Sequence, residues 1–279
     1  MAKYTAIVLS AGKGSRMGSS VHKQHLLLCG KPVIYYTLKA FEESPVDEIV
    51  LVTGEGEEEY CRKEIVEKYK LHKVTKIVKG GKERYHSVFQ GLSACEHTDY
   101  VLIHDGARPF IGQEVIRHII DEVQKKHACI AAMPVKDTIK KVDENGKVED
   151  TPPRKSLYTV QTPQAFSYSL IYDSYQKMIA DGREDVTDDA MVVEAYGKVP
   201  VYVIDGSYRN FKITTPEDLE MAEFMLNAGN PGLHSSFPHV PLRSAFCKFP
   251  LLRGISDPVP QLRLPEAAFR PETSCGCFP

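Results

Sequence analysis

The chain has 279 residues, 26% of them charged, with a formal net charge of -2 at neutral pH. Such a balanced charge argues against nucleic-acid binding, which usually requires a strongly basic face. No run approaches the roughly 18 apolar residues of a membrane span, and we expect no signal peptide. The length allows one large α/β domain, or a domain with an appendage.

The cysteines Cys29, Cys61, Cys95 and Cys129 lie singly within predicted elements and lack the spacing of metal ligands. Unpaired thiols of this kind are typical of a reducing compartment, so we expect a cytoplasmic protein.

The first predicted strand, Tyr4–Leu9, runs directly into the glycine-rich stretch Leu9–Gly18. Glycines at the end of a strand let backbone N–H groups approach a ligand with no Cβ in the way. Arg16 and Lys23 add two positive charges beside that turn, which suits a polyphosphate. The segment therefore predicts binding of a nucleoside triphosphate.

Two common glycine-rich nucleotide loops do not fit this segment. The dinucleotide pattern G-x-G-x-x-G fails because Gly18 comes one residue late, and a Walker A loop fails because no Lys-Ser/Thr pair follows Gly18. A plain strand–helix turn with solvated cations explains the glycines alone about as well. The two cations favour phosphate binding over that plain turn.

Strands and helices alternate along the chain, which predicts a doubly wound α/β fold around a mostly parallel sheet. Further strands are predicted at Glu48–Thr53, Val74–Val78, Tyr100–His104, Ile130–Pro134 and Val201–Ile204. Helices are predicted at Val33–Glu42, Glu57–Tyr69, Ser87–Ala94, Glu114–His127, Ser167–Ala180, Asp188–Tyr196 and Pro216–Asn227.

A second glycine turn, Gly80-Gly81, lies between the strand Val74–Val78 and the helix that begins at Ser87. Its backbone groups could bond to the edge of a base, and the Ser87 hydroxyl could bond to the same ligand. A plain strand–helix connection explains the pattern nearly as well.

Asp105 and Arg108 follow the apolar strand Tyr100–His104, at the end where a doubly wound sheet binds ligands. Asp105 could hold Mg²⁺ or a substrate hydroxyl, and Arg108 could bind a second phosphate. A salt-bridged Asp105–Arg108 turn is the alternative for this motif taken alone. We expect His104 to be a hydrogen-bonded structural residue, and Lys212, alone in an apolar extended run, to point at a ligand.

The acidic run Asp185–Asp189 could be taken for a metal site, yet it also fits a helix start with acids in the first turn. We expect the helix start, with Thr187 available to a ligand as well.

One stretch interrupts the alternation of strands and helices. Asn145-Gly146 stands between β-prone flanks within Asp137–Thr151, which is the strongest short signal for a hairpin. Both faces of this hairpin are polar, so it cannot close a core by itself. We predict a projecting arm, over about 137–158, that packs on a second subunit, with a mobile surface hairpin as the alternative.

The composition changes at Pro231, because nine of the 18 prolines fall between there and Pro279. Such a segment buries too little apolar surface to offset its ordering entropy. We predict one domain over residues 1–230 and a disordered or artefactual tail over 231–279, with a partner-binding tail as the alternative.

Seven segments, taken together and in order, resemble the 2-C-methyl-D-erythritol 4-phosphate cytidylyltransferase family of the non-mevalonate isoprenoid route. The resemblance covers residues 1 to about 228. The segments are Leu9–Gly18 with Lys23-Gln24, Gly80–Arg84, His104–Pro109, Pro134–Thr138, Gln161–Phe166, Thr187–Asp189 and Lys212–Asp218.

The resemblance implies a Rossmann-like nucleotidyltransferase in which the phosphate of a sugar-alcohol phosphate attacks the α-phosphate of CTP and pyrophosphate leaves. Positioning and charge stabilisation should dominate, because little covalent chemistry falls to the protein. The resemblance also implies Mg²⁺, or another divalent cation, near Asp105, and a homodimer formed through the arm.

Each matched residue takes a role from the same resemblance. Nucleotide binding falls to Ala11, Gly12, Gly14, Gly80 and Ser87. The catalytic cations are Arg16, Lys23 and Lys212. The polyol phosphate is held, partly across the dimer, by Asp105, Arg108, Thr138, Arg154, Thr162 and Thr187.

Three positions depart from the family pattern: His25 stands in place of an aromatic residue, Gly106 in place of alanine and Tyr158 in place of tryptophan. None of them removes a charge or donor assigned above. Ribitol-5-phosphate cytidylyltransferases share the first loop and the Gln-Thr-Pro-Gln pattern, but residues 154–158 and 185–189 favour the isoprenoid enzyme. A nucleotide-binding regulatory protein without turnover is a third interpretation.

Overall fold

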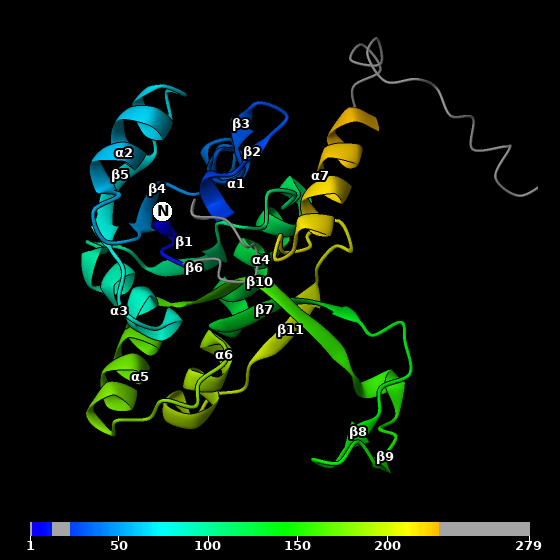
Figure 1. Ribbon diagram of the computed structural model, residues 1–279. Coiled ribbons are helices and arrows are strands. Elements are labelled where there is room, and N and C mark those ends of the chain that lie inside the picture. The colour runs from blue at the N-terminus through cyan, green and yellow to red at the C-terminus, as the bar shows by residue number, and fades with distance from the viewer. Residues whose placement is uncertain (1, 13–22, 229–279) are drawn as a thin grey trace, which may run out of the picture. The chain divides into compact units, whose positions relative to one another are not determined.

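The computed structural model describes residues 2–12 and 23–228 (Figure 1). Its central sheet has seven strands: β1 (Tyr4–Ser10), β4 (Glu48–Thr53), β5 (Val74–Lys79), β6 (Tyr100–Asp105), β7 (Ala128–Pro134), β10 (Tyr158–Ser167) and β11 (Tyr202–Asp205). They lie in the order β11-β7-β10-β6-β1-β4-β5. Neighbouring strands are parallel except where β10 pairs with β6 and β7, so the predicted fold class is confirmed.

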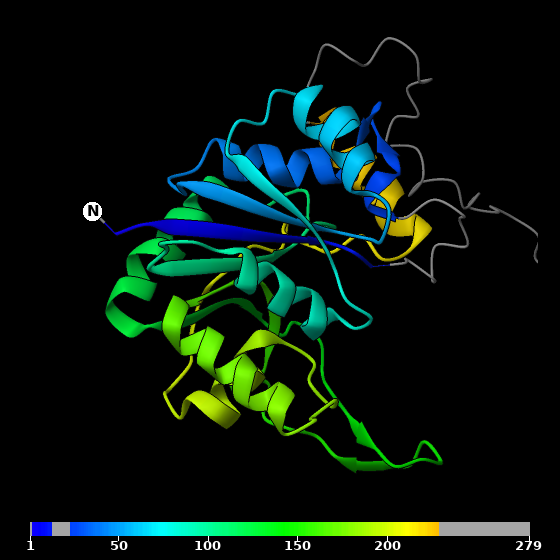
Figure 2. The same ribbon diagram turned by 90° about the vertical axis from the view of Figure 1, so that its left-hand side faces the viewer.

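Helices cover both faces of the sheet (Figure 2). One face carries α1 (Val33–Glu42), the segment α2–η3 (Glu58–Tyr60 and Cys61–Glu67) and α4 (Gln113–Lys126). The other carries α3 (Arg84–Ala94), α5 (Tyr168–Ala180), α6 (Asp189–Val192) and η5 (Val193–Gly197). Side chains alternate along each strand, so Ala6 and Val8 of β1 meet the first layer and Ile7 and Leu9 meet the second.

The last described helix, α7 (Pro216–Ala228), packs on α1 and on the hairpin of β2 (Leu27–Leu28) and β3 (Lys31–Pro32), which follows the turn η2 (Lys23–His25). Leu28, Val33, Ile213 and Ala222 form this third, small core. The Ile213 N–H also donates to the carbonyl of Ala107 at 2.8 Å. This packing fixes the neighbouring residue Lys212 beside the end of β6.

The predicted hairpin is present as β8 (Lys141–Val142) and β9 (Val148–Asp150), which pair antiparallel. Gly146 has a φ of +81°, which its place in the turn requires. Figure 1 and Figure 2 show the pair at the end of a segment that extends away from the sheet. The short turn η4 (Arg154–Ser156) leads from this arm back into β10.

Six of the seven strands of the central sheet were predicted, and β10 was not; the short strands β2 and β3 were not predicted either. Strand β10 contains Pro163, which argues against a central strand because proline cannot donate to a ladder. The structure accommodates this proline by a shift in the pairing of β10 with β7 between Val160 and Gln164. Such an irregularity removes the need for a ladder bond and turns side chains toward a site.

Candidate active site

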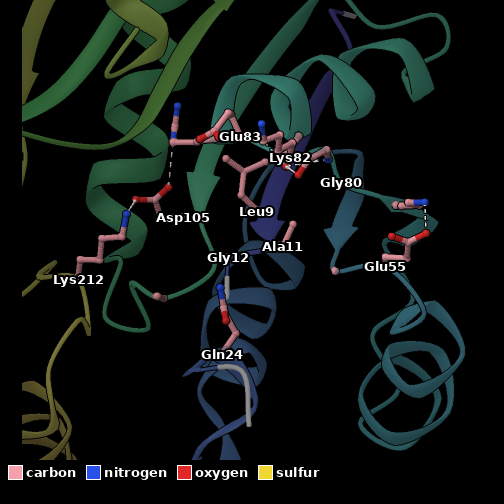
Figure 3. A pocket seen from close by; sticks show the side chains of 16 residues that line it. Leu9, Ala11, Gly12, Gln24, Glu55, Gly80, Lys82, Glu83, Asp105 and Lys212 are labelled. Carbon is pink, nitrogen blue, oxygen red and sulfur yellow. Dashed lines mark hydrogen bonds and ion pairs between the residues drawn. The ribbon is translucent and has the colours of Figure 1, made fainter. Parts of the chain in front are cut away.

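Two cavities that share part of their walls open at the carboxyl ends of the parallel strands. The chain passes from β4 and β5 on one side of β1 to β6 on the other, so this edge includes the topological switch point where such sheets bind ligands. The larger cavity has a volume of about 930 Å³ (Figure 3), and the smaller about 340 Å³. Arg84, Asp105 and Lys212 line both.

Four of the residues predicted to bind the nucleotide line the larger cavity: Ala11, Gly12, Gly80 and Ser87. Gly80 lies so close to its neighbours that a Cβ there would be 2.5 Å from the Cβ of Ala11 and 2.8 Å from Oγ of Ser87. The Gly81 N–H donates to the same Ser87 oxygen at 3.1 Å, which ties the turn to the first residues of α3. The backbone therefore forms this wall, as the glycines predicted.

The structure does not describe most of the other residues assigned to the triphosphate. Gly14 and Arg16 lie outside the described residues, and so does the side chain of Lys23. The backbone of Lys23 begins η2, next to Gln24, whose side chain lines the larger cavity. The roles of Gly14, Arg16 and Lys23 therefore stay predictions.

Three residues predicted to hold the polyol phosphate, Arg108, Thr162 and Thr187, line the smaller cavity together with Asp105. Nη1 of Arg108 donates to the carbonyl of Asn210 at 2.8 Å. Oγ1 of Thr162 accepts the N–H of Asp105 at 3.0 Å. Segments far apart in the sequence thus meet at one polar cavity.

Thr138 and Arg154 line neither cavity of their own chain. Both are exposed at the base of the arm, and Nη1 of Arg154 donates to the carbonyl of Lys136 at 2.8 Å. Their predicted role in binding the acceptor therefore stays a prediction.

Asp105 is the centre of the charge cluster between the cavities, and Figure 3 shows Lys212 pointing at it. Oδ2 of Asp105 lies 2.7 Å from Nζ of Lys212 and 3.8 Å from Nε of Arg108, and Oδ1 lies 3.5 Å from Nε of Arg84. Burial opposes the charge, but these three cations outweigh it and hold the pKa of Asp105 well below its usual range. The carboxylate is therefore ionised at neutral pH and available to a cation or a hydroxyl.

His104 is a buried structural residue, as predicted. Its Nδ1 lies 3.0 Å from Oγ1 of Thr162, and its Nε2 lies 3.3 Å from the carbonyl of Arg108. Burial lowers the pKa of His104 to about 3, so the ring is neutral. A neutral ring with its proton on Nε2 satisfies both contacts, because the carbonyl accepts and the threonine hydroxyl donates.

Arg84 is the main site residue without an assigned role in the sequence analysis. Its Nη1 and Nη2 donate to the two oxygens of Asp189 at 2.9 and 2.8 Å. Asp189 was expected only as an acid of a helix start; the capping residue is Asp188, whose Oδ1 accepts the Met191 N–H at 3.0 Å. The motif Gly80–Arg84 marked the arginine, but its partner lies 105 positions away and no local pattern joins them.

A metal ion at this site would take some of its ligands from substrate phosphates. Within residues 2–12 and 23–228, no group of three or more His, Cys, Asp or Glu side chains is placed to hold one. Mg²⁺ commonly binds through one or two carboxylates while substrate phosphates supply other ligands. The ionised Asp105 carboxylate, on the wall of both cavities, fits that requirement.

The family model of 2-C-methyl-D-erythritol 4-phosphate cytidylyltransferase matches residues 4–228. The chain belongs to this family. A curated relative of that name from Lachnoclostridium phytofermentans is 50% identical over 226 residues, covering 81% of this chain and 97% of the relative. Another of the same name, from Lachnospira eligens, is 51% identical over 224 residues, covering 80% and 98%.

Solved structures agree with this assignment. The 4-diphosphocytidyl-2C-methyl-D-erythritol synthase from Anaerococcus prevotii is 37% identical with a TM-score of 0.72, covering 81% of this chain and 96% of that one. The 2-C-methyl-D-erythritol 4-phosphate cytidylyltransferase from Thermus thermophilus is 29% identical with a TM-score of 0.66, covering 79% and 98%. The predicted class, a nucleotidyltransferase, is thereby confirmed. Among the described helices, none is both long and apolar enough to cross a membrane.

Proposed function

We propose that the protein transfers the cytidylyl group of CTP to 2-C-methyl-D-erythritol 4-phosphate, in the synthesis of isoprenoid precursors by the non-mevalonate route. The products are the CDP-alcohol and pyrophosphate. The observation that carries this proposal is the pair of cavities with Arg84, Asp105 and Lys212 on their common wall. Two substrates bound there would meet with their phosphates beside three cations, because Arg108 completes the cluster.

CTP takes the larger cavity in this proposal. The close approach of Gly80 leaves its backbone and the Ser87 hydroxyl facing the base or ribose. Ala11 and Gly12 bind the triphosphate at the end of β1, with Gly14, Arg16 and Lys23 predicted beside them. Backbone N–H groups suit this task because they bind phosphate without carrying a bulky side chain.

The acceptor takes the smaller cavity, with its phosphate on Arg108 and its hydroxyls on Thr162 and Thr187. Nε of Arg108 is buried and has no hydrogen-bond partner among the described residues. Such a donor costs free energy when left unpaired. It is therefore available to an acceptor phosphate, beside its 3.8 Å ion-pair contact with Asp105.

Transfer needs one bond made and one broken. An anionic oxygen of the acceptor phosphate bonds to the α-phosphorus of CTP, and the bond from that phosphorus to the oxygen that leads to the β-phosphate breaks. The electron pair leaves with pyrophosphate. No proton has to be removed from this nucleophile, so the protein's task is to align the two phosphates and offset charge with Lys212, Arg16 and Lys23.

Mg²⁺ is the proposed cofactor, and Asp105 is the residue that would hold it. When bound with CTP, a divalent cation neutralises charge on the phosphate oxygens. Lys212 lies 2.7 Å from the same carboxylate, so the two cations have to share Asp105 or Lys212 has to turn to a phosphate.

We also propose a homodimer formed through the arm. Ile139, Val142 and Val148 are 42%, 51% and 51% exposed there. Val142 and Val148 lie opposite each other on β8 and β9, so the hairpin offers apolar surface to a second chain. Thr138 and Arg154 stand at the base of the same arm, away from the cavities of their own chain. A second copy packed on the arm would bury the apolar groups and bring these two residues to its site.

The catalytic domain in this proposal is residues 1–230, and the segment 231–279 takes no part in the reaction. The family match ends at residue 228, which supports the division. A cytoplasmic location is supported by the thiols of Cys29, Cys61, Cys95 and Cys129, all of which are free.

The test is an assay of the full chain with CTP, Mg²⁺ and either 2-C-methyl-D-erythritol 4-phosphate or ribitol 5-phosphate, following both pyrophosphate and CDP-alcohol. We expect kcat/KM to be higher for the methylerythritol acceptor by about 100-fold or more, because buried polar groups reject an acceptor that leaves them unpaired. A preference for ribitol 5-phosphate would replace the acceptor. Absence of a CDP-alcohol with either acceptor would remove the proposed activity.

A further inference from the structure

We infer that Asp189 and Tyr175, which line neither cavity, are positioning residues that hold Arg84 and, through it, Asp105. The inference rests on the proposed function, because it assigns these roles within the same site. It concerns a closed ring of contacts, here called the anchoring ring, that consists of Asp105, Thr162, Gln164, Asp189 and Arg84, with Tyr175 attached to Asp189.

The first link of the anchoring ring is the bidentate pair between Arg84 and Asp189. Its two hydrogen bonds, of 2.9 and 2.8 Å, use both terminal nitrogens of the guanidinium. Asp189 is fully buried, whereas the side chain of Arg84 is 30% exposed and faces both cavities. A fork held at both tips cannot rotate without breaking both bonds, so Asp189 sets the plane of the guanidinium.

Tyr175 completes the set of partners of Asp189. Its hydroxyl donates to Oδ1 of Asp189 at 2.6 Å, and its ring is fully buried on α5. A buried carboxylate is costly unless hydrogen bonds satisfy its oxygens. Tyr175 therefore fixes the carboxylate that fixes Arg84.

Gln164 ties the same helix start to strand β10. Its Oε1 accepts the N–H groups of Asp189 and Ala190, both at 3.0 Å, and its Nε2 donates to Oδ2 of Asp188 at 2.9 Å. Two residues earlier on β10, Thr162 accepts the N–H of Asp105. Strand β10 thus holds the backbone of Asp105 directly, through Thr162. Through Gln164 it also holds Asp189, which positions Arg84 beside the Asp105 side chain.

The anchoring ring matters for the reaction because it prevents Arg84 from forming a bidentate ion pair with Asp105. The tips of the guanidinium are occupied by Asp189, which leaves Nε alone to meet Asp105, at 3.5 Å. Without Asp189, the same fork could close on Asp105 as a bidentate pair. The carboxylate would then no longer be available to the substrates. The alignment on which the transfer depends would be lost with it.

The test compares two tyrosines of helix α5 in the full chain. Tyr175→Phe removes the hydroxyl from the ring, and Tyr168→Phe removes a hydroxyl that donates to the carbonyl of Leu92 at 3.1 Å, outside the ring. Both lose one hydrogen bond, so we expect small falls in melting temperature in both. Only Tyr175→Phe should lower kcat, by about fivefold to 20-fold, with the KM values for CTP and acceptor within about twofold.

A double-substitution cycle tests whether Tyr175 acts through Asp189. Asp189→Asn should lower kcat by about 100-fold, because a misplaced catalytic group can cost that much. Adding Tyr175→Phe to Asp189→Asn should then lower kcat by less than about twofold more, since residues of one network are not additive. If Asp189→Asn does not fold, the comparison of Tyr175→Phe with Tyr168→Phe decides.

Three results would overturn the inference: an unchanged kcat in Tyr175→Phe, equal losses of kcat in the two tyrosine variants, or full additivity in the cycle. The first of these includes a rise in KM with kcat unchanged, because that would show a role in binding alone. Failure of the unaltered chain to form a CDP-alcohol would refute the proposed function instead, and the two failures are thus distinct.

Discussion

The cations around Asp105 differ in how firmly the rest of the protein holds them. Arg84 is held at both tips by Asp189, and Arg108 is held by the carbonyl of Asn210. Lys212 has the Asp105 carboxylate as its ion-pair partner at 2.7 Å, and 35% of its side chain is exposed. Lys212 is therefore the cation that can turn to a phosphate as charge develops.

Lys212→Gln should weaken catalysis without preventing folding. We expect kcat to fall by about 100-fold to 1000-fold, because a group that meets charge in the transition state is lost. Folding should be retained, since Arg84 and Arg108 still face Asp105. Steady-state kinetics and thermal unfolding measure the two effects.

Lys125→Gln is the matched control, because Lys125 pairs with Glu122 on the surface of α4. It should leave both kcat and the melting temperature near those of the unaltered chain. A kcat for Lys212→Gln within about threefold of the unaltered chain would contradict the catalytic role of this lysine.

The stability of the protein should depend on pH through His104. The buried ring of His104 has its pKa lowered from 6.5 to about 3, so between those values the unfolded chain takes up a proton that the folded chain does not. The free energy of unfolding should therefore fall as the pH falls from about 6.5, by at most about 1.4 kcal/mol per pH unit from this group.

Chemical denaturation at several pH values between 5 and 6.5 measures that slope. His104→Gln should have a smaller slope than the unaltered chain, while His118→Asn, which changes an exposed histidine of α4, should keep it. Equal slopes in the unaltered chain and His104→Gln would show that His104 is not the group that titrates.

The place of a residue at the candidate site could be predicted where one short segment carries both the polar side chains and the strand that positions them. Asp105 and Arg108 follow an apolar strand, and their place at the carboxyl end of β6 follows from the topology. Asp189 could not be predicted in this way. Its role depends on Arg84, which only the packing of α3 against α5 and α6 brings to it.

Helices and strands that are specified by a short stretch of sequence were predicted most accurately. Helix Val33–Glu42 begins after a proline with an amphipathic pattern, and strand Glu48–Thr53 is a short apolar run; both match the structure in full. Strand β10 has neither signal, since Pro163 interrupts its sequence. Its pairing partners, β6 and β7, also lie far from it along the chain. Its antiparallel direction is set by the whole sheet, which no local pattern encodes.

Charges placed on the arm should separate the proposed dimer. The double variant Val142→Glu with Val148→Glu places two charges on side chains that are each 51% exposed in one chain. We expect a monomer with activity lowered by about 100-fold or more, because Thr138 and Arg154 would no longer reach a partner's site. The melting transition of the sheet should persist, as neither valine belongs to its cores.

Light scattering and the cytidylyl-transfer assay measure the two outcomes. Met221→Glu, at a 55% exposed position of α7, is the control for adding charge to an exposed apolar site away from the arm. A monomeric mass for the unaltered chain with full activity would refute the dimer, and so would an active monomer of the double variant.

The proposed division between residues 1–230 and the segment that follows depends on helix α7. This helix closes the small core of Leu28, Val33, Ile213 and Ala222, in which Ala222 is fully buried. Ile213 of that core is the neighbour of Lys212. The catalytic domain should therefore need α7 but nothing after it.

Two truncations of the chain test this division. Truncation after Asn230 keeps α7, so we expect kcat/KM within about twofold and a melting temperature unchanged within about 2 °C, since no element of the described cores is removed. Truncation after Thr215 removes α7 and exposes Ile213 and Leu28. It should lower the melting temperature by several degrees and weaken activity, because Lys212 loses the packing beside it. A substantial loss of activity or stability on removing only residues 231–279 would show instead that this segment is part of the working enzyme.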